Sequence, residues 1–583
     1  MSSSEIETIF NSLFPISERK AFSQKLSYGT AGFRMKADSI LDRVVFSVGL
    51  LACLRALERN ESVGVMITAS HNGAQDNGVK LVDPSGEMLE ASWEEKAMRL
   101  ANRIHDASEL AATCQELAKE LNLDGNSTKT LCICVGKDTR ESSDRLVEYL
   151  KAAISTFRKE GIVFVDYGLV ITPQLHYMVM LANSHQETKN FLSQAFTSHE
   201  EKQAKVQDKL SENLNIYYEN ISHAFKSLVH KLEKPIDVNL DCAFGVGGKK
   251  VKELASHLKG FVNLTIVNDF EQVGIQSSQQ YLNHKCGAEY VQKQKAVPIN
   301  CENFKNLASI DGDGDRLVFY YINSNGDLCL LDGDKIASLL VKFIGEMLKK
   351  TNLLDQLIVG IVQTAYANGS STTYLKQVLG EERIFCVPTG VKYLHHKAKD
   401  LDVGVYFEAN GHGTVVFSDR AKKAIDDLYN KSKHEPSEMA EAISNLYAFT
   451  NLINSTVGDA FSDLLAVVAV LSYYHWSWSD WDSHLYTDVP SVQDKLRVKD
   501  RTIIKTSTDE TQVISPSGIQ DKINECVAKV KKGRAFIRPS GTEDVVRVYA
   551  EAETQQEAKD LAIDVLHIIY NDLQGTEKPP SKL

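Results

Sequence analysis

The chain has 583 residues, which at about 100–200 residues per domain implies about three to five domains and excludes a single hydrophobic core. Its 43% hydrophobic and 24% charged residues are near the average of globular proteins, which excludes a disordered chain, a collagen-like repeat or a small disulfide scaffold. The 65 Lys and Arg against 77 Asp and Glu give a formal net charge of -12, so nucleic acid is a poor partner and any anionic ligand needs a local cluster of cations.

The cysteine and targeting patterns indicate a cytosolic protein. The ten cysteines are scattered without a C-x-x-C pair, which predicts reduced core residues rather than a zinc knuckle or a redox dithiol. The N-terminus lacks a basic region followed by an apolar run, and the longest apolar tract, near Leu464–Leu471, is shorter than the roughly 20 residues of a membrane span. We therefore expect a cytoplasmic protein with no membrane association, and the sequence indicates no obligate protein partner.

The first block of the chain, residues 1–183, alternates short β-rich runs with amphipathic stretches, which is the pattern of parallel α/β units. Its predicted strands are Val63–Thr68, Leu131–Val135 and Ile162–Val165, and its predicted helices are Ser143–Phe157 and Pro173–Leu181. These elements predict one α/β domain.

The second block covers residues 184–330. Residues 184–234 are polar and rich in Gln, Lys and Glu without a strand signal, which predicts a helical insertion. The α/β pattern then resumes with strand Ile236–Asp241, a glycine turn at 245–248, helix Lys250–Leu258, strand Val262–Val267 and a strand that ends at Ile310.

The third block, residues 331–478, repeats the α/β pattern. Its predicted helices are Lys335–Leu348, Ser370–Leu379 and Val457–Tyr474, and its predicted strands are Leu357–Gln363, Arg383–Val387 and Val403–Glu408.

The pattern changes in residues 479–583. A strand is predicted at Thr502–Ile504, a helix at Gly518–Val530, a hairpin at Ala535–Ala550 and a closing helix at Gln555–Tyr570. This arrangement predicts a smaller α+β domain.

The sharpest chemical motif is Asp311-Gly312-Asp313-Gly314-Asp315-Arg316, which follows a predicted strand. Carboxylates at every second residue project to one side if the backbone is extended, and the glycines allow it to bend around an ion. Hard oxygen ligands of this kind suit Mg²⁺. An EF-hand would need Gly and Glu where Arg316 and Ile322 stand, so that reading fails. A solvated turn is the alternative, but three close carboxylates repel one another without a cation.

A second motif, Thr68-Ala69-Ser70-His71-Asn72, lies directly after a predicted strand, with Asn77-Gly78-Val79-Lys80 shortly beyond it. A serine at a strand end of an α/β domain lies where such folds place active sites. The G-x-S-x-G nucleophile elbow is absent, so Ser70 is not an obvious acyl-transfer nucleophile. We interpret Ser70 as a phosphate carrier whose phosphate oxygen completes the metal shell.

A third motif, Arg538-Pro539-Ser540-Gly541-Thr542-Glu543-Asp544 with Arg547 beyond it, lies between two predicted strands. Arginines, hydroxyls and glycine-freed backbone N–H groups are the donors that a phosphate dianion needs. A P-loop is absent, so nucleotide phosphate is not indicated. A plain surface turn remains the alternative.

Two further loops add polar groups. The first, Tyr28–Arg34, is rich in glycine and ends in a cation. The second, Glu408-Ala409-Asn410-Gly411-His412-Gly413, places a carboxylate, an amide and an imidazole after a strand, a set that suits sugar hydroxyls. Each loop alone has low specificity.

Four of these motifs carry a resemblance to a known family: those at Ser70, Asp311–Arg316, Glu408 and Arg538–Asp544. Their order and spacing resemble those of the α-D-phosphohexomutases over essentially the whole chain. The resemblance implies a four-domain fold, with three related α/β domains and a C-terminal α+β domain around a central cleft. The sugar loop of that superfamily usually reads Gly-Glu-x-Ser-Gly-His, and here Phe407 and Asn410 replace the glycine and the serine. With Thr456-Val457-Gly458-Asp459-Ala460 downstream, this variant is similar to the members that act on N-acetylglucosamine phosphates.

The resemblance implies interconversion of N-acetylglucosamine 6-phosphate and 1-phosphate, a step toward UDP-N-acetylglucosamine. Ser70 would be phosphorylated at rest and would bind Mg²⁺ with Asp311, Asp313 and Asp315, and a glucosamine-type 1,6-bisphosphate would be the intermediate and activator. The other expected roles fall into three groups. Charge neutralisation belongs to Arg34, Lys80 and Arg316; proton handling to Lys80 and His412; and substrate binding to Glu408, Asn410, His412, Arg538, Pro539, Ser540, Gly541, Thr542 and Arg547.

Three alternatives stay open at this point. The same site could serve glucose or mannose phosphates, because the pocket for an acetamide group is not visible in a sequence. A non-catalytic sugar-phosphate sensor would be expected to lack Ser70 or an aspartate, and all are present. A metal-dependent phosphatase would share the aspartates but would not need the distant Arg538 loop.

Overall fold

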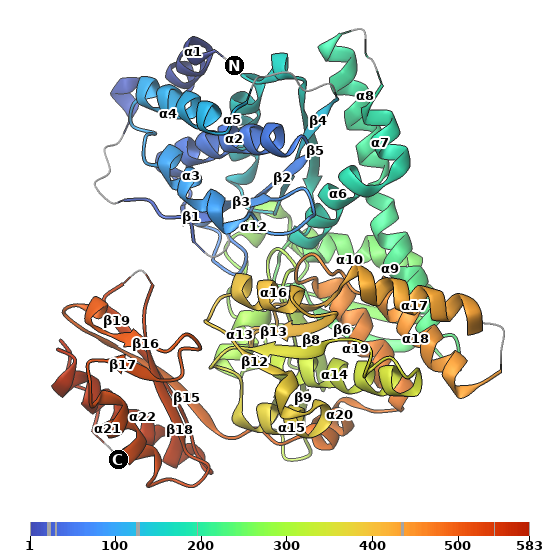
Figure 1. Cartoon of the computed structure of the whole chain (residues 1–583), viewed down its shortest axis with the longest axis vertical. Coiled ribbons are helices and arrows are strands. Elements are labelled where there is room, and N and C mark those ends of the chain that lie inside the picture. The colour runs from blue at the N-terminus through green and yellow to red at the C-terminus, as the bar shows by residue number, and fades with distance from the viewer. Residues whose placement is uncertain are drawn as a thin grey trace. The chain divides into compact units, whose positions relative to one another are not determined.

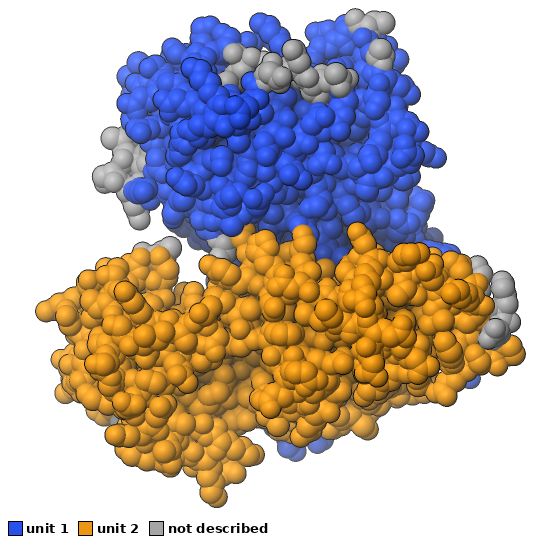
Figure 2. Space-filling model, in the orientation of Figure 1, with its two compact units in different colours: residues 1–330, 448–473 blue, residues 331–447, 474–583 orange. Residues whose placement is uncertain are grey.

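The computed structural model describes residues 2–19, 25–29, 32–123, 129–194, 196, 198–432, 436–541 and 543–581. The chain forms two compact units, which Figure 2 distinguishes by colour: residues 1–330 with 448–473, and residues 331–447 with 474–583. The predicted α/β class is confirmed, because mixed sheets alternate with helices through most of the chain (Figure 1). The division into four domains stays a prediction.

The first sheet of unit 1 has the strand order β1-β3-β2-β4-β5. Its strands are β1 (Phe33–Lys36), β2 (Val63–Ile67), β3 (Asp76–Val82), β4 (Leu131–Lys137) and β5 (Ile162–Leu169). β2, β4 and β5 run parallel, whereas β3 is antiparallel to β2 and to β1. β2 is buried along its whole length, as expected for the centre of a covered sheet.

Helices cover this sheet. α2 (Ser39–Arg59) packs on α5 (Ser143–Ser155) and on β2, β3 and β4, and α6 (Thr172–Ser184) packs on β2 and β4. Sixteen of the 21 residues of α2 are buried, so its hydrophobic residues occur all around the helix rather than on one stripe. α1 (Ser3–Leu13), α3 (Ala91–Ala101) and α4 (Ala107–Glu120) add a further layer.

The second sheet of unit 1 has the order β10-β9-β8-β6-β7. Its strands are β6 (Ile236–Asp241), β7 (Val262–Val267), β8 (Asn306–Ile310), β9 (Leu317–Ile322) and β10 (Leu328–Leu331). β10 ends at the boundary with unit 2. β6 is parallel to both β7 and β8, and β9 is antiparallel to β8. α10 (Gly247–His257) follows β6, and α13 (Ala288–Gln294) packs on β8 and β9.

Residues 184–234 are mainly helical: α7 (Gln186–Leu192), α8 (His199–Glu212) and α9 (Leu214–Leu228). α8 packs on β5, and its Gln203 and Gln207 side chains donate to the backbone carbonyls of Phe164 and Asp166. α9 packs on α6 and α10. These helices therefore cover the outer edge of one sheet and reach toward the other.

The first sheet of unit 2 has the order β12-β11-β13-β14. Its strands are β11 (Val359–Gln363), β12 (Ile384–Cys386), β13 (Val403–Phe407) and β14 (Gly413–Phe417), with β14 antiparallel to β13 and the others parallel. Its helices are α14 (Gly333–Lys350), α15 (Gly369–Leu379), α16 (Val391–Lys399), α17 (Asp419–Ser432) and α20 (Trp478–Leu485). α18 (Glu438–Leu452) and α19 (Ala460–Tyr474) contain the unit boundaries.

The C-terminal part of unit 2 is an antiparallel sheet of order β15-β19-β18, formed by β15 (Ser491–Arg497), β18 (Arg534–Pro539) and β19 (Val545–Glu551). α22 (Gln555–Asp572) covers one face, with α21 (Ile519–Val527) beside it. A two-stranded ribbon, β16 (Lys505–Thr506) with β17 (Val513–Ser515), completes this part. The expected α+β character is present.

Three of the sheets share one four-strand pattern. In each, a central parallel strand is joined by a short loop to an antiparallel neighbour, and two further parallel strands lie on its other side. The joined pairs are β2 with β3, β8 with β9 and β13 with β14. In the first sheet this pair precedes the two other parallel strands in the chain, whereas in the other two sheets it follows them. The expected relation among the three α/β parts is visible in this pattern.

Most predicted elements are present, and one is wrong. Residues Arg501–Ile503 form a turn of 3₁₀ helix rather than the strand predicted at Thr502–Ile504. Asp500 caps this turn by accepting the N–H of Thr502, so a local side-chain bond outweighs the β preference of Thr and Ile. The helix predicted from Val457 begins at Ala460, because Asp459 is its cap.

Other sequence expectations concern thiols and membranes. All ten cysteines lie in the described part of the chain and none of them forms a disulfide, and seven of them are buried. Across the described residues, we find no helix with the length and apolar character needed to cross a membrane.

Candidate active site

Three of the four predicted motifs lie at the same place in the repeated sheet pattern. The Ser70 motif joins β2 to β3, the Asp311–Arg316 motif joins β8 to β9, and the Glu408–His412 motif joins β13 to β14. Each loop therefore leaves the carboxyl end of a central parallel strand, where α/β folds place their ligands. The first two loops belong to unit 1 and the third to unit 2.

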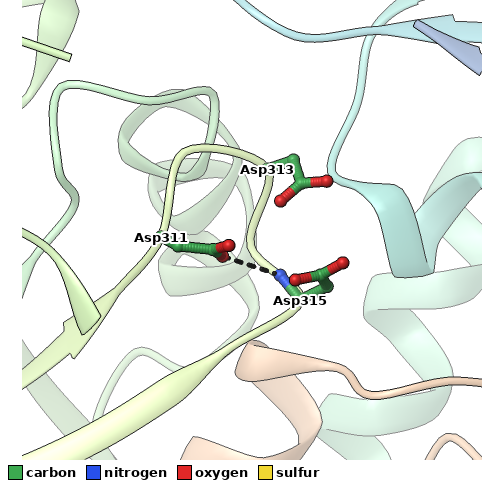
Figure 3. A group of neighbouring side chains, drawn as sticks. All are labelled: Asp311, Asp313 and Asp315. Carbon is green, nitrogen blue, oxygen red and sulfur yellow. Dashed lines mark hydrogen bonds between the residues drawn. The ribbon is translucent and has the colours of Figure 1, made fainter. Parts of the chain in front are cut away.

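The aspartate loop is a tight turn, as its glycines were expected to allow, and not an extended segment with its carboxylates on one side. The Asp311 carboxylate accepts the backbone N–H groups of Asp315 (3.1 Å) and Arg316 (3.2 Å), and Gly314 has a φ of +70°. The carboxylates converge because the backbone turns back on itself, as Figure 3 shows, rather than because alternate residues share one side.

Backbone bonds from three other segments hold this turn. The carbonyl oxygens of Gly312, Asp313 and Gly314 accept the N–H groups of Val246 (3.1 Å), Thr172 (2.9 Å) and Ala460 (3.1 Å), in that order. All of these segments belong to unit 1. Because three successive carbonyls are bound, the backbone between the aspartates has little freedom to move.

The three carboxylates form a cluster that fits a divalent cation. One oxygen from each of Asp311, Asp313 and Asp315 lies within 4.8 Å of the others, and all three residues are buried. Burial, together with the like charges of Asp315 and Asp313, raises the pKa of Asp311 well above its usual range. Asp313 Oδ1 is buried without a hydrogen-bond partner among the described residues. A buried oxygen left in this state suits a metal ligand, and the all-oxygen set suits Mg²⁺.

Ser70 is next to this cluster. Its hydroxyl donates to Asp311 Oδ2 at 2.8 Å, and the residue is 1% exposed. Its backbone N–H is held by the Thr68 hydroxyl (2.8 Å), which in turn donates to Asp138 (2.7 Å). The His71 ring nitrogen is 3.4 Å from the Ser70 hydroxyl, a long contact, so the nearer acceptor is the aspartate.

The backbone of Ser70 is strained and is held from outside its own loop. Its φ is +52°, a left-handed conformation that costs a non-glycine residue about 1–3 kcal/mol. The Ser70 carbonyl accepts from Arg140 (3.1 Å) and Asn283 (2.9 Å), and the Asn72 carbonyl accepts from the same two side chains at 2.6 and 3.0 Å. These four bonds keep the serine hydroxyl directed at Asp311.

The predicted cations of unit 1 also lie near this loop. Lys80, on β3, donates to Asp313 (3.1 Å) and Asp315 (3.2 Å). Burial alone would lower the pKa of Lys80, but the charges of Asp313 and Asp315 outweigh it and raise the pKa. Arg316 Nε lies 3.9 Å from Asp311 and 4.0 Å from Asp315. Arg34, on β1, donates to the Asn72 side chain at 3.2 Å.

The Glu408–His412 loop of unit 2 is shaped by its own polar groups. The N–H of Glu408 donates to the His412 carbonyl (2.9 Å), and the Asn410 amide bridges the Glu408 carboxylate (3.2 Å) and the His412 N–H (2.9 Å). Asn410, itself a predicted substrate-binding residue, thus links the other two, Glu408 and His412. A Cβ atom on Gly333, the first residue of α14, would come within 1.9 Å of the Glu408 carbonyl, so only glycine allows α14 to begin so close.

The predicted phosphate loop connects β18 to β19. Arg538 is at the end of β18 and donates to Glu510 (2.8 Å), and the buried Ser540 donates its N–H to the Val545 carbonyl (2.8 Å). The Gly541 carbonyl accepts from Arg501 at 3.0 Å. Pro539 is the last residue of β18. Thr542 lies outside the described residues.

The sheet register adds a cation that the sequence argument missed. Arg538 is directly opposite Arg547, and Arg547 is directly opposite Lys495 on β15, so three cations form a row across the sheet. Like charges in this arrangement repel one another. Neither Arg547 nor Lys495 forms an ion pair with any described residue. An anion bound over the row would relieve the repulsion.

Two other missed residues are Arg140 and Asn283. Arg140 follows β4, the parallel neighbour of β2, so its place at the same edge of the sheet was a usable signal. Asn283 lies in an irregular loop far from any motif, and only the folded chain brings it to Ser70.

Comparison with known proteins identifies the domains of this chain. Family models match residues 332–476 (phosphoacetylglucosamine mutase AMG1, domain III), 495–568 (phosphoglucomutase/phosphomannomutase, C-terminal domain) and 47–108 (phosphoglucomutase/phosphomannomutase, alpha/beta/alpha domain I). The fold is thus that of the α-D-phosphohexomutase superfamily.

Individual relatives show which family within this superfamily the chain belongs to. The phosphoacetylglucosamine mutase of Sus scrofa is 42% identical over 563 residues, which cover 95% of this chain and 96% of the relative. The Aspergillus fumigatus N-acetylphosphoglucosamine mutase in complex with GlcNAc-6P and magnesium is 40% identical with a TM-score of 0.84, covering 97% of this chain and 98% of that one. A serine-to-alanine variant of the fungal protein, in complex with glucose 1,6-bisphosphate, has a TM-score of 0.82 at 39% identity, with the same coverage. The chain belongs to the phosphoacetylglucosamine mutase family.

Substitution of Gly245 tests its close approach to Gly312 in the aspartate turn. A Cβ atom on Gly245 would lie 2.3 Å from the Gly312 carbonyl oxygen, and the three nearest atoms are all backbone atoms of Gly312. We expect Gly245→Ala to destabilise the protein by about 1–3 kcal/mol, the usual cost of overpacking. Urea denaturation measures the effect. Gly345→Ala is the control, because its Cβ would meet nothing closer than 3.7 Å, and an equal loss in the two variants would contradict the prediction.

Proposed function

We propose that this protein interconverts N-acetylglucosamine 6-phosphate and N-acetylglucosamine 1-phosphate. The observation that carries the proposal is the buried Ser70 hydroxyl, held 2.8 Å from a cluster of three buried aspartates in a chain of the phosphoacetylglucosamine mutase family. The fungal relative that was solved with GlcNAc-6P and magnesium supports the substrate. The product is the form that a nucleotidyl transfer toward UDP-N-acetylglucosamine consumes.

Ser70 is the proposed phosphate carrier. In the first half-reaction a sugar hydroxyl forms a P–O bond as the bond from phosphorus to Ser70 Oγ breaks, which yields a 1,6-bisphosphate. In the second, the other phosphoryl group of the sugar moves to Ser70, and the hydroxyl that it leaves regains a proton. Lys80 and His412 are the proposed groups that handle these protons. The fungal relative in complex with glucose 1,6-bisphosphate supports a bisphosphate intermediate.

The residues around Ser70 supply charge and position rather than covalent chemistry. Phosphoryl transfer proceeds through a loose transition state in most analyses, so neutralisation and alignment dominate. Asp311, Asp313 and Asp315 with an oxygen of the Ser70 phosphate are the proposed ligands of Mg²⁺, which would neutralise charge on the transferring group. Arg34, Lys80 and Arg316 add positive charge there, and Arg140 with Asn283 keeps the serine loop in place.

Unit 2 supplies the proposed contacts to the rest of the substrate. Glu408 and His412, linked by Asn410, bind sugar hydroxyls. The loop from Arg538 through Pro539, Ser540, Gly541 and Thr542, together with Arg547, binds the phosphate that is not being transferred. Lys495 joins this set because of its register with Arg547.

We also propose that the protein acts in the cytosol. Its ten free cysteines support a reducing compartment. A small sugar phosphate is the proposed partner, in keeping with the ligands of the fungal relative.

Replacement of the proposed carrier tests the mechanism. We expect Ser70→Ala to fold and to lose mutase activity, because no hydroxyl remains to accept the phosphoryl group. The assay follows conversion of N-acetylglucosamine 6-phosphate, and mass spectrometry measures phosphate on the protein. Ser47→Ala is the matched control, because Ser47 is equally buried and its hydroxyl only donates to the Val44 carbonyl of its own helix. Appreciable turnover by Ser70→Ala would sink the covalent scheme.

A comparison of three substrates tests the specificity. We expect kcat/KM for N-acetylglucosamine 6-phosphate to exceed the values for glucose and mannose 6-phosphates by at least about tenfold, because a site built around a polar substituent rejects analogues that lack it. Steady-state kinetics under one set of conditions measures all three. An equal or higher value for glucose or mannose phosphate would make the protein a general hexose phosphate mutase.

The cation row predicts a role for Lys495 in substrate binding. We expect Lys495→Gln to raise KM for the sugar phosphate about fivefold, or ~1 kcal/mol, with kcat nearly unchanged, because an exposed cation contributes this much to an ionic contact. The difference should shrink at high salt, which screens exposed charges. Lys559→Gln on α22 is the control, since it makes the same charge change at an exposed position. An equal KM in both variants would contradict the proposed contact of Lys495 with the substrate.

A further inference from the structure

The cap of α19 contains a buried carboxylate, Asp459, that is bound to the helical segment 184–234. The Tyr217 hydroxyl on α9 contacts Asp459 Oδ1 and Oδ2, each at 2.9 Å, and the Asn454 amide donates to Oδ2 at 3.0 Å. Asp459 and Tyr217 are both 0% exposed. A carboxylate out of contact with water needs such donors, because an unsatisfied buried charge is very costly.

Asp459 also determines where α19 begins. Its Oδ1 accepts the N–H groups of Phe461 (3.0 Å) and Ser462 (3.2 Å), which is the bonding of a helix N-cap. The N–H of Ala460, the first residue of the helix, has no partner within the helix. It donates instead to the carbonyl of Gly314 at 3.1 Å.

Gly314 lies between two of the proposed metal ligands, Asp313 and Asp315. Its φ of +70° depends on the course of the turn, and a Cβ at this position would come within 2.8 Å of Ile171. A displacement of the start of α19 would therefore move the carbonyl of Gly314, and with it the backbone that carries the two carboxylates.

We propose that Tyr217 and Asp459 are positioning residues that set the metal-binding geometry of the Asp311–Asp315 turn through the N–H of Ala460. The inference rests on the proposed role of that turn as a Mg²⁺ site. It gives the segment 184–234 a function, because α9 reaches the metal turn through a chain of three contacts. It also gives a function to the Thr456–Ala460 motif, which the proposed chemistry does not otherwise use.

The neighbouring tyrosine on α9 provides a matched control. Tyr218 is 3% exposed, and its hydroxyl donates to Glu253 on α10 at 2.9 Å, away from Asp459. Each Tyr→Phe substitution removes one oxygen and keeps the ring, so the packing of Tyr217 against Tyr177 and Tyr218 is retained. Tyr217→Phe removes a donor from the Asp459 carboxylate, whereas Tyr218→Phe removes a donor from the Glu253 carboxylate.

The experiment measures binding of Mg²⁺ alone to the full-length protein by isothermal titration calorimetry, and KM for N-acetylglucosamine 6-phosphate. We expect Tyr217→Phe to weaken Mg²⁺ binding about tenfold, the lower end of what outer-shell substitutions cost in metal affinity. The KM should stay unchanged, because the residues proposed to bind the sugar and its second phosphate are not altered. Tyr218→Phe should bind Mg²⁺ as the wild type does.

A second variant, Ala460→Pro, tests the last link of the chain. Proline is well tolerated at the first position of a helix. It removes the N–H that Gly314 accepts and places its Cδ atom where that hydrogen lay, so the Gly314 carbonyl loses this bond and has to shift. We expect the same loss of Mg²⁺ affinity in a folded protein.

The outcomes distinguish the positioning role of Tyr217 and Asp459 from the assignment of the Asp311–Asp315 turn as a Mg²⁺ site. Wild-type affinity in Tyr217→Phe and Ala460→Pro, or equal losses in Tyr217→Phe and Tyr218→Phe, would overturn the positioning role while the metal site stands. A wild-type protein that does not bind Mg²⁺ would overturn the metal assignment and this inference with it.

Discussion

The site of unit 1 depends on one constraint, the binding of three successive carbonyls in the aspartate turn. Gly312, Asp313 and Gly314 each accept a backbone N–H from a different part of the chain. With the carbonyls bound on the outside, the carboxylates converge on the inside, where they repel one another and burial raises the pKa of Asp311. The turn keeps this unfavourable arrangement because its backbone bonds, and the cation Lys80, oppose the repulsion.

The same sheet pattern provides the position of three chemically different loops. In each α/β sheet the loop that follows the central parallel strand carries the polar residues, and it holds a serine, an aspartate cluster or a carboxylate–amide–imidazole set. The strands that lead into these loops are buried along all or nearly all of their length, which makes them rigid supports. Chemical variety therefore resides in the loops, and the sheets supply the geometry. The fourth loop, between β18 and β19, uses an antiparallel hairpin, and its cations are aligned by strand register instead.

Much of the fold and of the site could be predicted because the signals are local. The strands Ile236–Asp241 and Val262–Val267 have their predicted bounds, because apolar residues largely alternate with polar ones between turn residues, which is the local pattern of a strand. The conformation of short segments was harder to predict from the sequence. At Thr502 the cap from Asp500 stabilises a 3₁₀ turn instead of a strand. At Asp311 the carboxylate accepts two backbone N–H groups, which stabilises a tight turn instead of an extended segment. In both places hydrogen bonds to one aspartate side chain outweigh propensity.

By itself, the sequence determined the α/β class, the strands that end in polar loops, and the residue types able to bind a cation, a sugar and a phosphate. These follow from hydrophobic period and from the chemistry of single residues, which a linear pattern records. Only the tertiary structure decided which distant groups meet. Asn283 reaches Ser70 across 213 residues, Tyr217 reaches Asp459 across 242, and Lys495 aligns with Arg547 through strand pairing. Such contacts depend on how sheets and helices pack, and packing is a property of the whole chain rather than of any one segment.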